Sequence, residues 1–159
     1  MDSDKLSTEE VIAYYKPELE KLAVYSPWLK AQKGKKTATI FKGEGVEKNS
    51  LTFPIYDGTL LGFVRTAQAS KLIDRNYVYF YSRTGIRSQK EEWDFIQNAT
   101  IKEMSDLWKI FSKYILKGMT KAGLWSEAVE SGIFLELLLK MKDIIAFWGK
   151  LRKENERQG

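Results

Sequence analysis

The segment from Gly132 to Trp148 constrains the fold of this chain more than any other. A helix here would be apolar around most of its circumference, with residues Ile133, Phe134, Leu135, Leu137, Leu138, Met141, Ile144, Ile145 and Phe147. Four charged residues (Glu136, Lys140, Lys142 and Asp143) interrupt it too often for a membrane span. A helix that is apolar on most sides needs protein neighbours on most sides. The sequence therefore predicts the central helix of a bundle, ending near Trp148.

Helix-start signals recur through the rest of the chain. A capping box pairs a Ser or Thr with a Glu three residues later, and both side chains satisfy free backbone N–H groups. Pro17 and Pro27 interrupt the first helical region, so we expect two short helices or one bent helix that ends near 33–34. The expected caps are capping boxes at 7–10, 88–91 and 100–103 and single aspartates at Asp57 and Asp74.

Two short runs differ from this helical pattern. Residues 37–41 and 51–56 are rich in β-branched and aromatic types, and residues 42–50 between them have turn chemistry. Pro54 lacks an N–H donor, which confines its strand to a sheet edge. A small β-hairpin near residues 37–56 is the expected result.

These signals predict a mainly α fold, a compact multi-helix bundle-like domain with that hairpin. We expect a single domain over residues 1–159, with a helical, basic extension (1–50), a helical core (53–148) and a charged tail that frays (149–159). Hydrophobic residues make up 43% of the chain, which is enough for a packed core. The expected core includes Leu107, Phe111, Trp125, Phe134, Leu138 and Ile145.

The chain contains no histidine and no cysteine. Disulfides are therefore impossible, and the usual zinc ligands and Ser-His or Cys-His nucleophile pairs are missing. The remaining carboxylates, lysines and tyrosines form no catalytic pattern, so we expect a protein that is not an enzyme and that uses no cofactor. The first residues, Met1-Asp2-Ser3-Asp4-Lys5, begin acidic, so we expect no signal peptide and a cytoplasmic location.

Two motifs resemble functional sites only superficially. Gly34-Lys35-Lys36-Thr37 looks like the end of a phosphate-binding loop, but position 29 is leucine where that loop needs glycine. Glu91, Glu92 and Asp94 form an acidic cluster of the kind that holds Mg²⁺. The same carboxylates lie just after a helix cap, where they complement the helix dipole, and we favour that structural interpretation.

One stretch is anomalous in charge. No acidic residue occurs between Lys21 and Gly43, whereas the chain as a whole carries a net charge of only +5. Basic side chains interleaved with aromatic ones suit contact with phosphates and bases. The alternative is a solvated, flexible connection between helix and hairpin. The candidate partner-binding residues are Trp28, Lys30, Lys33, Lys35, Lys36, Phe41 and Lys42.

Residues from Phe53 to about Ile145 resemble an uncharacterised family of small bacterial and phage proteins, the domain of unknown function numbered 6508. The resemblance rests on residues 53–56, 72–77 and 96–99 and on the tryptophan motif at 123–134. It departs at 117–121, where the family pattern is more strongly charged and this chain reads Lys-Gly-Met-Thr-Lys. The resemblance implies a small cytoplasmic protein of Gram-positive bacteria and their phages, but no activity. By analogy, such accessory proteins often disable host machinery, including CRISPR nucleases.

Five residues of the family-like region are expected to hold the fold together: Asp74, Arg75, Tyr77, Trp125 and Glu127. Arg75 and Glu127 are candidates for a partly buried ion pair. Three classes of function stay open. The first is a non-catalytic interaction protein that inhibits a host defence nuclease or nucleoprotein such as a CRISPR effector. The second is a nucleic-acid-binding accessory protein that uses residues 21–43. The third is an enzyme built on carboxylates, Arg75 and Tyr77, whose site would be a cavity lined by Asp74, Arg75, Tyr77 and Glu127.

Overall fold

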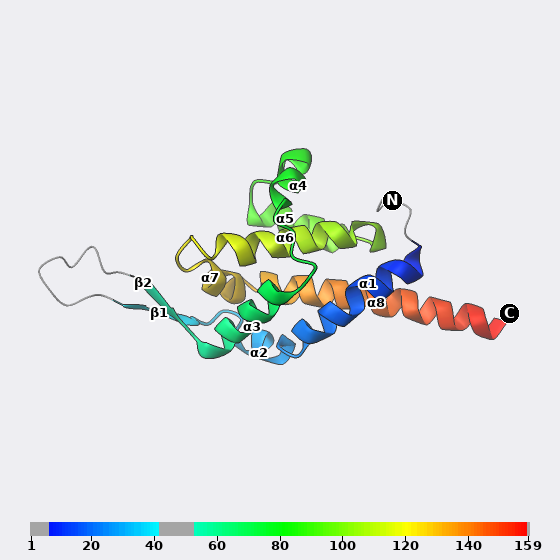
Figure 1. Ribbon diagram of the computed structural model, residues 1–159, viewed down its shortest axis with the longest axis horizontal. Coiled ribbons are helices and arrows are strands. Elements are labelled where there is room, and N and C mark those ends of the chain that lie inside the picture. Colours follow the sequence, from blue (N-terminus) through cyan, green and yellow to red (C-terminus); the bar gives the residue numbers. More distant parts are fainter. Residues whose placement is uncertain (1–6, 42–52, 159) are drawn as a thin grey trace, which may run out of the picture.

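The structure is a computed structural model that describes residues 7–41 and 53–158 (Figure 1). In this part of the chain the fold is helical, with a short 3₁₀ turn and one pair of strands, as the sequence predicts. The elements in chain order are α1 (Thr8–Ala23), α2 (Ser26–Gln32), β1 (Ala38–Phe41), β2 (Phe53–Tyr56), α3 (Gly58–Ala69), α4 (Tyr77–Thr84), α5 (Gln89–Asn98), η2 (Ile101–Glu103), α6 (Met104–Lys117), α7 (Leu124–Ser131) and α8 (Ile133–Gln158).

The local cap signals are largely confirmed. Ser7 opens α1 with a full capping box, and Thr100 does the same for η2. The Asp57 carboxylate accepts a hydrogen bond from the backbone N–H of Thr59 at 2.7 Å, at the start of α3. The prediction for Asp74 is wrong. Its carboxylate accepts from the N–H of Asn76 at 2.7 Å, a turn that closes before α4 begins at Tyr77.

The first two helices show how packing overrides a local signal. A break falls between α1 and α2, next to the Ser26-Pro27 pair, as expected. Pro17, however, lies inside α1 and does not end it. Proline removes one backbone hydrogen bond, but α1 also buries Leu19 and Leu22 in the core, and α1 packs along α8.

The predicted hairpin is confirmed. The strands β1 and β2 are antiparallel, with Ala38 opposite Tyr56 and Phe41 opposite Phe53. They extend away from the helical body at the end where α7 lies (Figure 1). The Tyr56 hydroxyl accepts from the N–H of Gly123 at 2.7 Å, and the Tyr56 ring lies 5.1 Å from that of Trp125. The helices thereby stabilise a pair of strands that would be marginal alone.

The core lies where α8 packs against five other helices, α1, α2, α5, α6 and α7. At its centre the rings of Phe63, Phe111 and Phe134 meet edge to face, with centroids 5.1–5.9 Å apart. The expected core residues Leu107, Phe111, Phe134, Leu138 and Ile145 are all buried. Trp125 is a correction, because it is only half-buried at the edge of this core.

The last helix is longer than the sequence predicts. The helix α8 continues to Gln158, so the predicted end near Trp148 is wrong.

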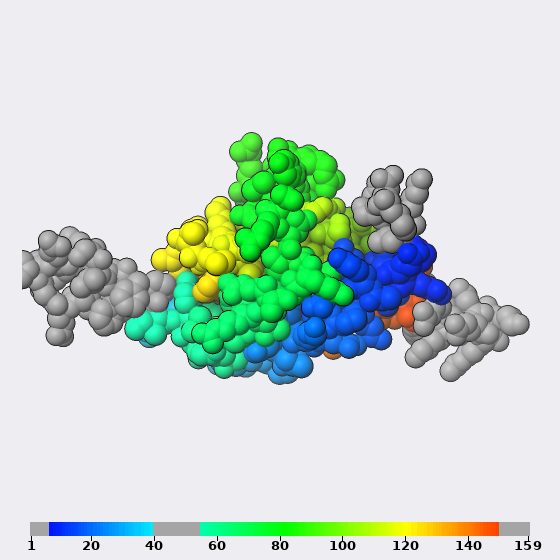
Figure 2. All heavy atoms as spheres, viewed as in Figure 1, coloured from blue at the N-terminus to red at the C-terminus, as the bar shows by residue number. Residues whose placement is uncertain are grey.

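The helix α4 stands out on the surface. Figure 2 shows that the segment containing α4, in green, projects above the rest of the described surface. That helix exposes Val78 and Tyr79 while it buries Phe80. No helix in the described ranges is long and apolar enough to cross a membrane.

Candidate functional site

The basic turn, residues 30–36, joins the end of α2 to the hairpin. Lys30 lies in the last turn of α2, and Lys33, Lys35 and Lys36 follow it; all four side chains are exposed. Among the described residues, none of these lysines forms an ion pair with a carboxylate. Within the described ranges, their positive charges therefore face solvent with no carboxylate at ion-pairing distance.

The basic turn is attached to α7. Gly34 adopts a φ of +81°, which lets the chain turn so that its N–H donates to the carbonyl of Glu130 at 2.9 Å. Just after the turn, the hydroxyls of Thr37 and Ser126 are hydrogen-bonded at 2.9 Å, and Thr37 is buried. The segment is therefore held against the helix on both sides of Lys35 and Lys36 rather than being a free connection.

Lys33 has a second role in this attachment. Its methylene groups lie over Gly132, the residue between α7 and α8: a Cβ added there would sit 2.7 Å from Lys33 Cε. Long basic side chains commonly bury their stems in this way while the ammonium group stays in water. Lys33 therefore contributes to packing as well as to the charge of the basic turn.

The other three predicted contact residues are Trp28, Phe41 and Lys42, and each has a different outcome. Trp28 is half-buried and packs against the core. Phe41 is the last residue of β1. Lys42 lies outside the described residues.

The proposed structural motif is not assembled as one unit. Asp74 and Arg75 line a cavity of about 440 Å³ beside Tyr15 and Trp108, whereas Glu127 lines a different cavity. Tyr77 lines neither of these two cavities. The predicted partly buried Arg75–Glu127 pair is wrong, because both side chains are exposed and no ion pair joins them. Neither of these two cavities is therefore lined by all four residues of the third hypothesis.

Trp125 does hold the fold together, but locally. Its indole N–H donates to the carbonyl of Ile115 at 3.0 Å. The indole lies so close to Gly118 that a Cβ there would be 2.1 Å from Nε1. Gly118 thus provides the space for this ring.

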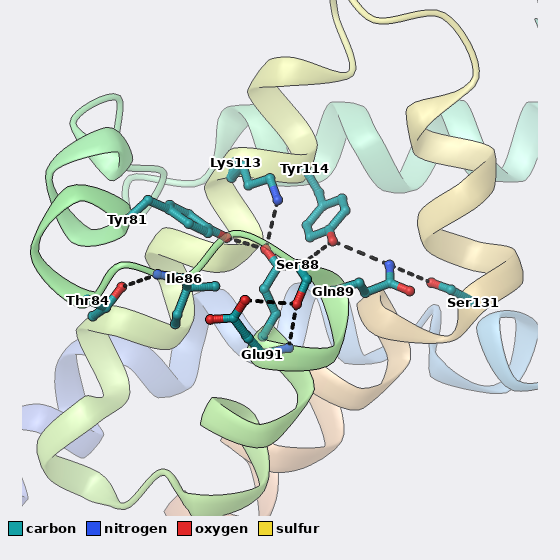
Figure 3. A network of polar contacts seen from close by, with 10 residues as sticks. Tyr81, Thr84, Ile86, Ser88, Gln89, Glu91, Lys113, Tyr114 and Ser131 are labelled. Carbon is teal, nitrogen blue, oxygen red and sulfur yellow. Dashed lines mark hydrogen bonds and ion pairs between the residues drawn. The ribbon is translucent and has the colours of Figure 1, made fainter.

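Sequence reasoning treated Glu92 only as one of three carboxylates near a helix start and missed that its side chain is buried. Its side chain is 1% exposed and receives three donors from two other helices. Figure 3 labels the three donor residues, Tyr81, Lys113 and Tyr114. The hydroxyls of Tyr81 and Tyr114 each donate at 2.5 Å, and the Lys113 ammonium donates at 2.8 Å. Glu92 lies four residues before buried Ile96 on α5, and this spacing could have flagged a carboxylate on the apolar face.

The electrostatics of this network favour a structural role. Burial, together with the negative charge of Glu92, raises the pKa of Tyr81. Burial and the hydrogen bond to Glu92 raise the pKa of Tyr114. Both phenols therefore stay protonated as donors, and both carboxylate oxygens of Glu92 are occupied. The network joins α4, α5 and α6 and fixes Lys113 and Tyr114 on the wall of a cavity of about 200 Å³.

No group of three or more His, Cys, Asp or Glu side chains in the described part of the chain is placed to hold a metal ion.

Comparison of the chain with protein-family models, with curated proteins and with solved structures gives no match.

Proposed function

We propose that this protein acts by non-catalytic binding, and that the basic turn is its contact with a phosphate-rich partner. The partner class is a host ribonucleoprotein, such as the guide-RNA nuclease of a bacterial defence system. The observation that carries the proposal is the set of four exposed lysines without an ion-pair partner among the described residues, held against α7 and α8.

The charge of the basic turn and its attachment to α7 each support binding. Unpaired ammonium groups create a local positive potential that attracts a phosphate-rich surface and speeds the encounter. Attachment of Gly34 and Thr37 to α7 lowers the conformational entropy that binding would cost, since the backbone is already positioned. The mobile-element setting comes from the family resemblance alone.

A nucleic-acid-binding accessory protein is the alternative that uses the same surface. The two functions differ in whether bare nucleic acid is sufficient as a partner. If it is, RNA stripped of protein should bind as tightly as the nucleoprotein.

The proposal is tested by affinity capture from a Gram-positive bacterial lysate. The bait variants are wild type, Lys30→Glu/Lys35→Glu/Lys36→Glu, and a matched control with Lys16→Glu/Lys102→Glu/Lys142→Glu. The control lysines are also exposed and have no ion-pair partner in the described chain. Lys33 is left unchanged because its stem packs on Gly132.

We expect wild type and the control to retain one RNA-containing complex at low salt, and the basic-turn variant to lose it. Treatment with ribonuclease should release the partner if RNA carries the contact. Equal retention by all three baits, or retention of no RNA-containing complex by wild type, would contradict the proposal.

A further inference from the structure

The 200 Å³ cavity beside the Glu92 network lies on a different face of α7 from the basic turn. Its wall is formed by the start of α5, the last two turns of α6 and one face of α7. Glu127 and Ser131 are four residues apart and belong to this side, because Glu127 lines the cavity and Ser131 accepts from Gln89. Ser126 and Glu130 belong to the side that holds the basic turn.

Three lysines line this cavity in a regular row. Lys113 and Lys117 are four residues apart on α6, so they share one helix face. Lys121 continues the row, because its N–H donates to the carbonyl of Lys117 at 2.9 Å and extends the helical turn. The row places three ammonium-bearing side chains along one wall.

The charges in the cavity are only partly matched. Lys113 pairs with buried Glu92, but Lys117, Lys121 and Glu127 form no ion pair in the described structure. Two positively charged side chains and one negatively charged side chain therefore line one small cavity without forming an ion pair in the described structure. A ligand that carries an anionic group and hydrogen-bond donors can bridge them, the anion at the lysines and the donors at Glu127.

The wall around these groups is preorganised. Glu92 holds Lys113, and the Tyr114 hydroxyl donates to Glu92 while it accepts from Gln89 Nε2 at 3.4 Å. Gln89 also donates to Ser131 Oγ at 3.3 Å, which links α5 to α7 (Figure 3). These bonds fix the part of the wall that Gln89, Lys113 and Tyr114 form, which lowers the entropic cost of binding against it. The side chains of Lys117, Lys121 and Glu127 are exposed beside that wall.

Size and charge define the ligand class. The volume of about 200 Å³ is below the ~300–1,000 Å³ of sites that take drug-sized molecules, so the ligand is small. A phosphate monoester carries close to two negative charges, which match the two unpaired lysines, Lys117 and Lys121. We propose that this cavity binds a sugar phosphate, with its phosphate at Lys117 and Lys121 and a sugar hydroxyl at Glu127.

Isothermal titration calorimetry with ribose 5-phosphate tests this site. Wild type should bind it saturably, and Lys117→Gln/Lys121→Gln should weaken binding at least about tenfold, because charge-assisted hydrogen bonds are lost. Lys16→Gln/Lys102→Gln, which alters exposed lysines elsewhere, should bind like wild type. Unphosphorylated ribose should not bind.

Two further measurements are needed. One distinguishes a free sugar phosphate from a nucleic-acid end as the ligand, and the other distinguishes binding at this cavity from binding at the basic turn. A 5′-phosphorylated oligonucleotide that competes with ribose 5-phosphate, when its 5′-hydroxyl form does not, would assign the ligand to a nucleic-acid end. Failure of both to compete would assign it to a free sugar phosphate. The basic-turn variant should bind ribose 5-phosphate like wild type, since Lys30, Lys35 and Lys36 do not line this cavity. If wild type does not bind ribose 5-phosphate, or Lys117→Gln/Lys121→Gln binds it equally well, the cavity is not a phosphate site.

Discussion

The ammonium group of Lys113 lies 2.8 Å from the carboxylate of Glu92, a side chain that is 1% exposed. Two tyrosine hydroxyls complete the coordination of that carboxylate. Because the four groups come from α4, α5 and α6, this network joins three helices and fixes one wall of the adjacent cavity.

Replacement of Glu92 by alanine should therefore destabilise the fold. Lys113, Tyr81 and Tyr114 would lose their shared acceptor, and we expect a loss of about 2–4 kcal/mol in the free energy of unfolding. Asp94→Ala, on the exposed face of the same helix, should change it by less than about 0.5 kcal/mol. Urea denaturation measures both; equal midpoints would show that the network contributes nothing to stability.

Stability should fall at alkaline pH because of the buried tyrosines. The pKa of Tyr81 and of Tyr114 is raised in the folded state, and burial raises that of Tyr15 to about 12. Below about pH 10 these phenols are protonated in both states; above it the unfolded chain releases protons that the folded chain keeps. The free energy of unfolding should then decrease by up to about 1.4 kcal/mol per pH unit for each such tyrosine.

Comparison with Tyr81→Phe isolates one of these contributions. The variant cannot release the phenolic proton in either state, so its stability should decline less steeply between pH 10 and 11 than that of wild type. Denaturant titrations at several pH values give the two slopes. Identical slopes would mean that Tyr81 ionises as readily in the folded chain as in the unfolded one.

Gly118→Ala should be destabilising although Gly118 has an ordinary negative φ. The new Cβ would lie 2.1 Å from Trp125 Nε1, so the indole would move and weaken its bond to the Ile115 carbonyl. We expect a cost of about 1–3 kcal/mol. Gly149→Ala is the matched control: nothing lies near its Cβ position, and alanine should stabilise α8 by up to about 1 kcal/mol. A thermal melt in which the two variants behave alike would contradict the packing of Trp125.

Neighbouring leucines on α8 test the central position of that helix. Leu138 is 1% exposed and Leu139 is 39% exposed. Leu138→Ala should cost about 2–5 kcal/mol, because it leaves a cavity in the core. Leu139→Ala should cost much less. If the two variants unfolded at the same denaturant concentration, α8 would be peripheral.

The features that sequence reasoning predicted correctly depend on neighbours in the chain. Ser7 and Thr100 carry their capping partners three residues away, and the hairpin is indicated by two short runs of β-forming residues. The burial of Phe111 and Phe134 follows from helical periodicity.

The features that it missed depend on distant parts of the chain. Glu92 is buried because α4 and α6 supply its three donors, and its own helix gives no sign of them. The end of α8 was misplaced because the apolar period stops at Trp148, while the Lys, Arg and Glu residues beyond it still favour helix. The attachment of the basic turn rests on Ser126 and Glu130, which lie about ninety residues further along the chain.

The central claim, that the basic turn contacts phosphates, is tested most directly by the salt dependence of RNA binding. Fluorescence anisotropy with a labelled, 5′-hydroxyl single-stranded RNA should be measured over a series of KCl concentrations. The three proteins to compare are wild type, Lys30→Glu/Lys35→Glu/Lys36→Glu and the Lys16→Glu/Lys102→Glu/Lys142→Glu control. Thermal melts should show that both triple variants fold like wild type, because exposed charges contribute little to stability.

For wild type and the control, the logarithm of the affinity should fall steeply and linearly with the logarithm of the salt concentration. Loss of three phosphate contacts should weaken binding by the basic-turn variant at low salt and make its slope shallower by about two. If the basic-turn variant binds RNA with the affinity and the salt slope of wild type, the basic turn does not contact phosphates and the account is wrong.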